Sequence, residues 1–202
     1  MNTRLRIKQA ALKLFNKEGI MNITLRAIAK ELNKSYGNVT YHYKTKNELV
    51  MSLYLDMMEK MAGLQLLFNP ETLFEDVLKA PSATFKISIK YSFLYTDYVE
   101  IKRNFPSIAA RLGEDAAKRK VNYSSILKEL QQQGYLRSDL QQQELDYLMD
   151  LSGIVRTFYF LDLSPQDFHQ DNIEHDYLHQ VNQLIFPYLT EKGIIAYRKA
   201  GF

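Results

Sequence analysis

The chain has 202 residues, of which 46% are hydrophobic and 24% charged, a balance that is ordinary for a soluble protein with a packed core. It contains no cysteine, which excludes disulfides, thiolate nucleophiles and zinc sites built on sulfur. No run approaches the roughly 18 apolar residues of a membrane span, and the amino end leads into no apolar secretion segment. We therefore expect a cytoplasmic protein.

The net charge of +3 is unevenly distributed along the chain. Through residue 50 there are ten Lys or Arg and three Glu, a balance of +7, whereas the remainder holds sixteen basic and twenty acidic side chains, a balance of −4. A basic segment of this kind favours contact with a polyanion, although surface lysines often serve only solubility. The first fifty residues are therefore a candidate nucleic-acid-binding part.

Apolar residues recur at helical spacing in this basic part. A first helix is predicted by Ile7, Ala10, Ala11, Leu14 and Phe15, followed by Gly19, and a second by Leu25, Ile28, Ala29 and Leu32, between Thr24 as N-cap and Asn33. Ser35 can cap a third helix whose core positions are Val39 and Tyr43, so most of its side chains must face outward. Thr45 and Glu48 fit the capping box of a fourth helix.

Helical patterns continue beyond residue 50, separated by proline and glycine signals, and alternating strand-like runs are missing. Long helices are predicted near residues 84–103, 108–133, 141–163 and 174–190. The predicted fold class is all-α, with about nine helices. An N-terminal helix-turn-helix module of three helices, in a predicted DNA-binding domain of residues 1–49, precedes a larger helical bundle in residues 50–202.

The motifs of the first fifty residues come in a distinctive order. They read Ala10-Ala11-Leu12-Lys13-Leu14-Phe15, Gly19, Thr24 to Ala29, Ser35-x-Gly37-x-Val39 and Tyr41-His42-Tyr43-x-x-Lys46-x-x-Leu49. This order resembles the TetR family of transcriptional regulators, and weaker echoes such as Phe93-Leu94-Tyr95-x-Asp97 extend into the rest of the chain. Asn33 replaces a common turn glycine of the family. Thr40 replaces a tyrosine often used on phosphate, with a tyrosine one place later at Tyr41.

We expect the third helix to lie in the major groove of double-stranded DNA. Tyr36, Asn38 and Thr40 are placed to meet base edges or methyl groups. Lys34, Tyr41, His42 and Lys46 are predicted phosphate contacts, Thr24 and Arg26 reach the flanking backbone, Ser35 caps the helix, and Gly37 lets the backbone come close. Tyr43 is expected to pack. The simpler alternative is that the tyrosines only pack the module and the lysines only solvate it.

Tyrosines after residue 50 are the candidate ligand-binding residues: Tyr91, Tyr95, Tyr123, Tyr147 and Tyr159. They combine an apolar wall with a polar tip, as a pocket in a helical bundle requires, although aromatic stripes are more often core. The resemblance to TetR regulators implies that residues 50–202 are a ligand-sensing and dimerisation domain that binds an unknown small-molecule effector. His169, His175 and His179, with Asp171, Glu174 and Asp176, form the one metal-like cluster, but no third ligand is firmly placed, so no metal or cofactor is predicted.

The sequence thus predicts a sequence-specific, DNA-binding transcriptional regulator, a repressor controlled by a small-molecule effector. A homodimer is expected because one short recognition helix covers only a half-site. Its apolar surface is expected from Leu145, Leu148, Val155, Val181, Leu184 and Ile185. An enzyme is not expected, because no nucleophile motif, Gly-rich phosphate loop or spaced carboxylate pair stands out. The alternatives are a constitutive helix-turn-helix DNA binder without ligand, and an all-helical ligand-binding protein or enzyme.

Overall fold

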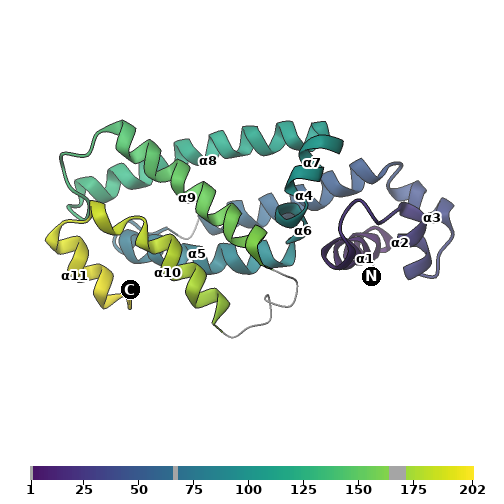
Figure 1. Ribbon diagram of the computed structural model, residues 1–202, viewed down its shortest axis with the longest axis horizontal. Coiled ribbons are helices and arrows are strands. Elements are labelled where there is room, and N and C mark those ends of the chain that lie inside the picture. Colours follow the sequence, from purple (N-terminus) through teal and green to yellow (C-terminus); the bar gives the residue numbers. More distant parts are fainter. Residues whose placement is uncertain (1, 66–67, 164–171) are drawn as a thin grey trace. The chain divides into compact units, whose positions relative to one another are not determined.

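The computed structural model describes residues 2–65, 68–163 and 172–202, and their regular structure is helical apart from one isolated β-bridge between Leu136 and Leu189 (Figure 1). These ranges hold eleven α-helices and one 3-10 helix, so the all-α class is confirmed with more helices than expected. The elements are α1 Thr3–Glu18, α2 Leu25–Glu31, α3 Tyr36–His42, α4 Lys46–Gln65, α5 Leu73–Lys90, α6 Phe93–Thr96, α7 Tyr98–Asn104, α8 Pro106–Gln132, α9 Gln142–Asp162, α10 Ile173–Gln183, η2 Phe186–Tyr188 and α11 Glu191–Lys199. No helix in the described ranges is long and apolar enough to cross a membrane.

The first helices begin and end where their capping residues predict. The side chain of Thr24 accepts a hydrogen bond from the backbone N–H of Ala27, and that of Ser35 accepts one from Asn38, both at 3.2 Å. Asn33 closes the turn after α2 with a φ of 52°, a left-handed conformation that Asn tolerates. At the start of α4, the hydroxyl of Thr45 accepts from the N–H of Glu48, whereas the Glu48 carboxylate accepts from Lys44.

The prediction of one long helix over residues 84–103 is wrong. The chain turns twice in this range, which holds the end of α5, then α6 and most of α7. Tertiary hydrogen bonds hold the two turns: the side-chain oxygen of Asn16 accepts from the N–H of Phe93, and the Asp97 carboxylate accepts from Ile20. Pro81, one of the proline signals that were expected to separate helices, lies inside α5. Proline has no N–H for the helical ladder and its ring crowds the carbonyl four residues earlier, but the burial of Leu78 and Phe85 on either side of it favours a continuous helix.

The chain divides into two compact units. Unit 1 comprises Met1–Met61 and Ile87–Arg111, and unit 2 comprises Ala62–Lys86 and Leu112–Phe202. The predicted boundary after residue 49 thus falls inside unit 1. In unit 1, α1 packs on α2 and on α6, α2 packs on α3, and the rings of Phe15 and Phe93 lie 5.2 Å apart. These contacts fix the short helices α2 and α3, which are too short to be stable alone.

Unit 2 is a helical bundle in which α9 packs on α8 and α10 (Figure 1). Leu145 and Leu148 of α9 lie in its core, as do Ile185 and, on α10, Val181. The expectation that these residues form an apolar surface is therefore wrong. The exposed apolar side chains of α9 are instead Tyr147, Ile154, Phe158 and Leu161, at exposed fractions between 39% and 65%. We call these four residues the α9 apolar face.

Candidate nucleic-acid interface

Helix α3 presents nearly all of its side chains to solvent. Val39 is its one buried residue, whereas Tyr36 and Asn38 are exposed and Tyr41 is 84% exposed. A helix usually buries an apolar face of three or four residues per two turns, so α3 is held mainly by its cap and by its packing on α2. The result is a short, outward-facing helix after a tight turn, the geometry with which a helix-turn-helix enters the major groove.

The three residues predicted to meet bases lie on α3, and their side chains make different contacts. Asn38 keeps its side-chain amide exposed on the first turn. The Thr40 hydroxyl donates to the carbonyl oxygens of Tyr36 and Gly37, at 3.2 and 3.3 Å, so its methyl group is the part left for a base. The guanidinium of Arg26 lies over the ring of Tyr36, 5.3 Å from its centre. The structure thus brings together Arg26, predicted to contact the DNA backbone, and Tyr36, predicted to contact a base.

The remaining polar residues of the module divide into caps and exposed groups. Thr24 and Ser35 use their hydroxyl oxygens to cap α2 and α3. Lys34 is exposed, and the rings of Tyr41 and His42 meet edge to face at 5.2 Å. At Gly37 an added Cβ would meet only the Ser35 hydroxyl, at 4.0 Å. Glycine costs a helix roughly 0.5–1 kcal/mol relative to alanine, and the protein's own packing does not require it here.

Lys46 lies apart from these exposed groups. Its ammonium donates to the carbonyl oxygens of Ile20 and Ile23, at 2.7 and 3.0 Å, and lies 5.8 Å from the centre of the Phe105 ring. Burial lowers the pKa of Lys46, because a desolvated ammonium is less stable than a hydrated one. The predicted phosphate contact is thus placed inside unit 1, where it holds the loop between α1 and α2.

Asp97 holds the same loop from the other side. Its carboxylate accepts from the N–H of Ile20 at 2.6 Å, and Lys46 attracts it. Burial nevertheless raises the pKa of Asp97, and the hydrogen bond from Ile20 only partly offsets this. In the sequence, Asp97 was noted only as part of a segment that weakly resembles TetR regulators. Its role was missed because a contact between residues 77 positions apart leaves no signal in local spacing.

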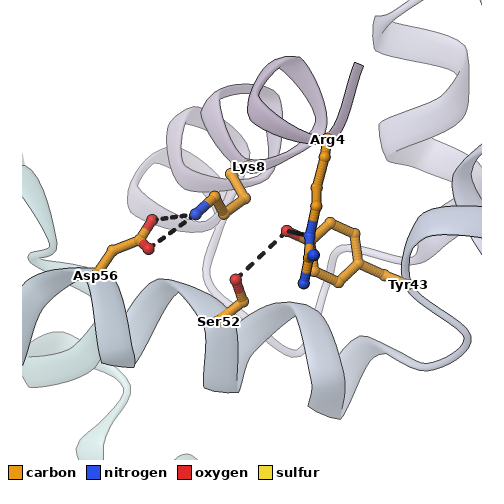
Figure 2. A network of polar contacts seen from close by, with 5 residues as sticks. All are labelled: Arg4, Lys8, Tyr43, Ser52 and Asp56. Carbon is orange, nitrogen blue, oxygen red and sulfur yellow. Dashed lines mark hydrogen bonds and ion pairs between the residues drawn. The ribbon is translucent and has the colours of Figure 1, made fainter. Parts of the chain in front are cut away.

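A second polar network joins α1 to the end of α3 and to α4 (Figure 2). Tyr43 is buried, as expected, but its hydroxyl accepts from the Nε of Arg4 at 3.2 Å and lies 3.3 Å from the Ser52 hydroxyl. One turn along α1, the ammonium of Lys8 donates to both carboxylate oxygens of Asp56, at 2.8 and 2.5 Å. The contacts of Arg4 with Tyr43 and of Lys8 with Asp56 both help to attach α1 to α4, and neither was predicted from the sequence.

The five predicted ligand tyrosines are divided between the units. Tyr91 and Tyr95 belong to unit 1, where Tyr91 is buried and the Tyr95 hydroxyl lies 2.9 Å from that of Ser88. Tyr123, Tyr147 and Tyr159 belong to unit 2. Tyr147 is 61% exposed on the α9 apolar face.

Tyr159 is held by a hydrogen bond and by neighbouring aromatic rings. Its hydroxyl donates to the carbonyl oxygen of Ile173 at 2.8 Å, and its ring packs edge-on against those of Phe85 and Tyr177. Burial raises the pKa of Tyr159 to about 12. Beside it, Arg156 donates to the hydroxyls of Thr84 and Tyr177, at 3.2 and 3.4 Å.

The metal-like cluster falls partly outside the described residues, because His169 and Asp171 are not among them. His175 and His179 are exposed on α10. Within the described part of the chain, no three His, Cys, Asp or Glu side chains come together to hold a metal ion.

Comparison with known proteins agrees with this geometry. The family model described as bacterial regulatory proteins, tetR family, matches residues 7–53, and the model described as a bacterial transcriptional repressor of the TetR type matches residues 47–197. The chain belongs to the TetR family. Such proteins are DNA-binding transcriptional regulators rather than enzymes, and the resemblance seen in the motifs is confirmed.

Individual relatives of this TetR-family chain match over part of it or at low identity. An HTH-type transcriptional regulator of Staphylococcus aureus strain USA300 is 46% identical over 46 residues, which cover 23% of this chain and 25% of that one. The match therefore spans about a quarter of that relative. A TetR-family regulator from Marinobacter aquaeolei VT8 covers 99% of both chains at a TM-score of 0.85 and 23% identity. The fatty acid degradation regulator FadR from Bacillus halodurans has a TM-score of 0.72 at 15% identity, over 92% of this chain and 95% of its own. Both of these solved structures share the fold of this chain.

Proposed function

We propose that this TetR-family protein is a cytoplasmic, homodimeric repressor that binds a two-fold symmetric operator through α3 and leaves it when a small molecule binds. The observation that carries the proposal is the exposure of α3, where Val39 alone is buried. The exposed side chains of Tyr36 and Asn38 contribute nothing to the hydrophobic core. A short helix with such side chains facing outward fits the major groove of DNA.

Within the interface, we assign base reading to Asn38 and backbone contact to the exposed cations and rings. The Asn38 amide can bridge adenine, which exposes one donor and one acceptor in the major groove. Lys34, Tyr41 and His42 are assigned to phosphates, which set the register of α3. Gly37 supports close approach to DNA, since the protein leaves open space beside it. We do not assign Lys46 to phosphate, because its ammonium is bound to Ile20 and Ile23.

We assign the dimer contact to the α9 apolar face. Tyr147, Ile154, Phe158 and Leu161 are separated by seven, four and three positions, so they form one stripe of the kind that pairs helices. Val121 on α8 is also 68% exposed, and Lys120, the residue before it, forms an ion pair with Asp150 of α9. A continuous exposed stripe of large apolar side chains marks an interface in a water-soluble protein. A two-fold axis would pair the stripe with its own copy.

We assign effector binding to the surroundings of Tyr159 and Arg156 in unit 2. A guanidinium beside packed aromatic rings offers a charge for an acidic group and apolar walls for the remainder of a ligand. The name of the Bacillus halodurans relative ties that protein to fatty acid degradation, and an apolar acid is the ligand class that we propose here. If no effector exists, the protein is a constitutive DNA binder, the alternative that the sequence left open.

The test is selection of a binding site from random double-stranded DNA, followed by a reporter gene under the selected site. We expect an inverted repeat whose half-sites lie about one helical turn, ~34 Å, apart or a multiple of it. Reporter output is expected to fall when the protein is expressed. Enrichment of no sequence would contradict operator binding, and increased reporter output would identify an activator. Release from the selected operator by apolar acids, lost in Arg156→Met, would support the effector assignment.

A further inference from the structure

We propose that Arg4, on the first turn of α1, is an additional DNA-binding residue, which the Tyr43 hydroxyl orients toward a phosphate at the end of α3. The inference rests on the proposed operator-binding function. Its starting point is the contact of Arg4 with Tyr43, the residue that ends α3 and directly follows His42. The guanidinium is therefore bound to the side chain of the residue that directly follows Tyr41 and His42, to which we assign phosphate contacts.

The charge of Arg4 is not matched by an anionic partner at hydrogen-bonding distance. Its neighbour Lys8, one turn along α1, forms an ion pair with Asp56, whereas the hydrogen-bond partner of the Arg4 guanidinium is a neutral phenol (Figure 2). The bond to Tyr43 uses Nε, and among the described residues no protein group accepts from Nη1 or Nη2. These two nitrogens form the edge with which arginine binds a phosphate through parallel hydrogen bonds.

The network also orients the guanidinium before DNA arrives. Tyr43 is 2% exposed, so its ring is fixed by the core, and the guanidinium carbon of Arg4 lies 5.2 Å from the centre of that ring. The Ser52 hydroxyl, 3.3 Å from that of Tyr43, holds the phenol from the side of α4. An arginine held in this way loses less side-chain freedom on binding than a mobile surface lysine.

The test measures affinity for the selected operator between 50 and 200 mM salt. Arg4→Gln should remove two phosphate contacts per dimer, so the magnitude of the slope of log affinity against log salt should fall by about 1.8. Over this salt range the wild-type affinity should then fall about twelvefold more than that of the variant. The loss should be the same for the operator and for unrelated DNA, since phosphate carries no sequence.

Arg6→Gln is the matched control, because it removes the same charge from the exposed face of α1 about 200° around the helix from Arg4. Tyr43→Phe tests the orienting role by keeping the ring and removing the hydroxyl. It should weaken DNA binding in the wild-type background and have no further effect in Arg4→Gln. Ser52→Ala leaves the bond between Arg4 and Tyr43 but removes the contact that holds the phenol, so it should weaken DNA binding less than Tyr43→Phe does.

The outcomes separate the inference from the function on which it rests. An Arg4→Gln slope equal to that of the wild type, or to that of Arg6→Gln, with tight operator binding retained, would overturn the role of Arg4 alone. Equal effects of Tyr43→Phe in both backgrounds would overturn the orienting role. A wild-type protein without salt-dependent DNA affinity would overturn both the inference and the proposed function. Urea unfolding of each variant reports changes in the fold, which the salt slope does not.

Discussion

Lys46 offers a direct comparison between a structural and a DNA-binding role. The substitution Lys46→Met keeps the aliphatic stem and removes the ammonium, and with it the hydrogen bonds to the carbonyl oxygens of Ile20 and Ile23. Hydrogen bonds from a charged group contribute about 1.5–3 kcal/mol each. Dehydration of the ammonium, which lowers the pKa of Lys46, offsets part of this gain. We expect a net loss of about 2 kcal/mol, a sizeable fraction of the 5–15 kcal/mol typical of folded proteins.

The assay pairs urea unfolding with the salt dependence of DNA affinity. Lys46→Met should lower the urea midpoint and leave the salt slope of the folded protein unchanged, because we assign its ammonium to the carbonyl oxygens of Ile20 and Ile23 and not to phosphate. Lys34→Met is the matched control, since Lys34 is exposed. It should keep the midpoint and reduce the magnitude of the salt slope by about 1.8 per dimer. Wild-type stability with a reduced slope in Lys46→Met would refute the structural role and restore the phosphate contact.

Three further predictions concern groups elsewhere in the chain. Burial raises the pKa of Asp97 above its ordinary 3.8, so the folded state binds this proton more tightly than the unfolded state does. Relative to Asp97→Asn, the wild-type free energy of unfolding should therefore be greatest below pH 3.8 and fall as the pH rises through the raised pKa, as measured by urea unfolding. The same rule applied to Tyr159, whose pKa is raised from 10.0 to about 12, predicts that wild-type stability falls relative to Tyr159→Phe between pH 10 and 12 and matches its pH dependence below pH 9. Phe158 exposes 65% of its surface, roughly 130 Å² or about 3 kcal/mol if a partner covers it, so Phe158→Asp should convert dimer to monomer in analytical ultracentrifugation. Ile195→Asp, on the 64% exposed Ile195 of α11, should not, and an unchanged mass for Phe158→Asp would exclude the α9 apolar face.

The sequence predicted best those features that depend on neighbours within one helical turn. Thr24 and Ser35 cap the helices as predicted, and Asn33 adopts the left-handed conformation, since each needs only backbone groups two or three positions away. The small core contribution of α3 also followed from the spacing of Val39 and Tyr43, both of which are buried.

Features that depend on distant contacts were missed. The charge on Lys46 and its place in the motif led to the prediction of a phosphate contact. Nothing in the local pattern indicates that the carbonyl oxygens of Ile20 and Ile23 lie nearby. Helix α9 carries apolar side chains on two faces, so its period alone could not decide which face is core. Leu148 is buried and Phe158 exposed. The turns around α6 likewise depend on Asn16, in a different helix.

The most direct test of operator recognition compares binding to the selected operator and to a scrambled duplex of the same length and base composition, by fluorescence anisotropy at fixed salt. Wild-type protein should bind the operator at least about a thousandfold more tightly than the scrambled duplex. Asn38→Ala should reduce that ratio by about 1–3 kcal/mol at each base pair it reads while leaving scrambled-duplex affinity unchanged. Equal affinity of the wild type for both duplexes, or an Asn38→Ala variant with the full wild-type ratio, would contradict sequence reading by α3.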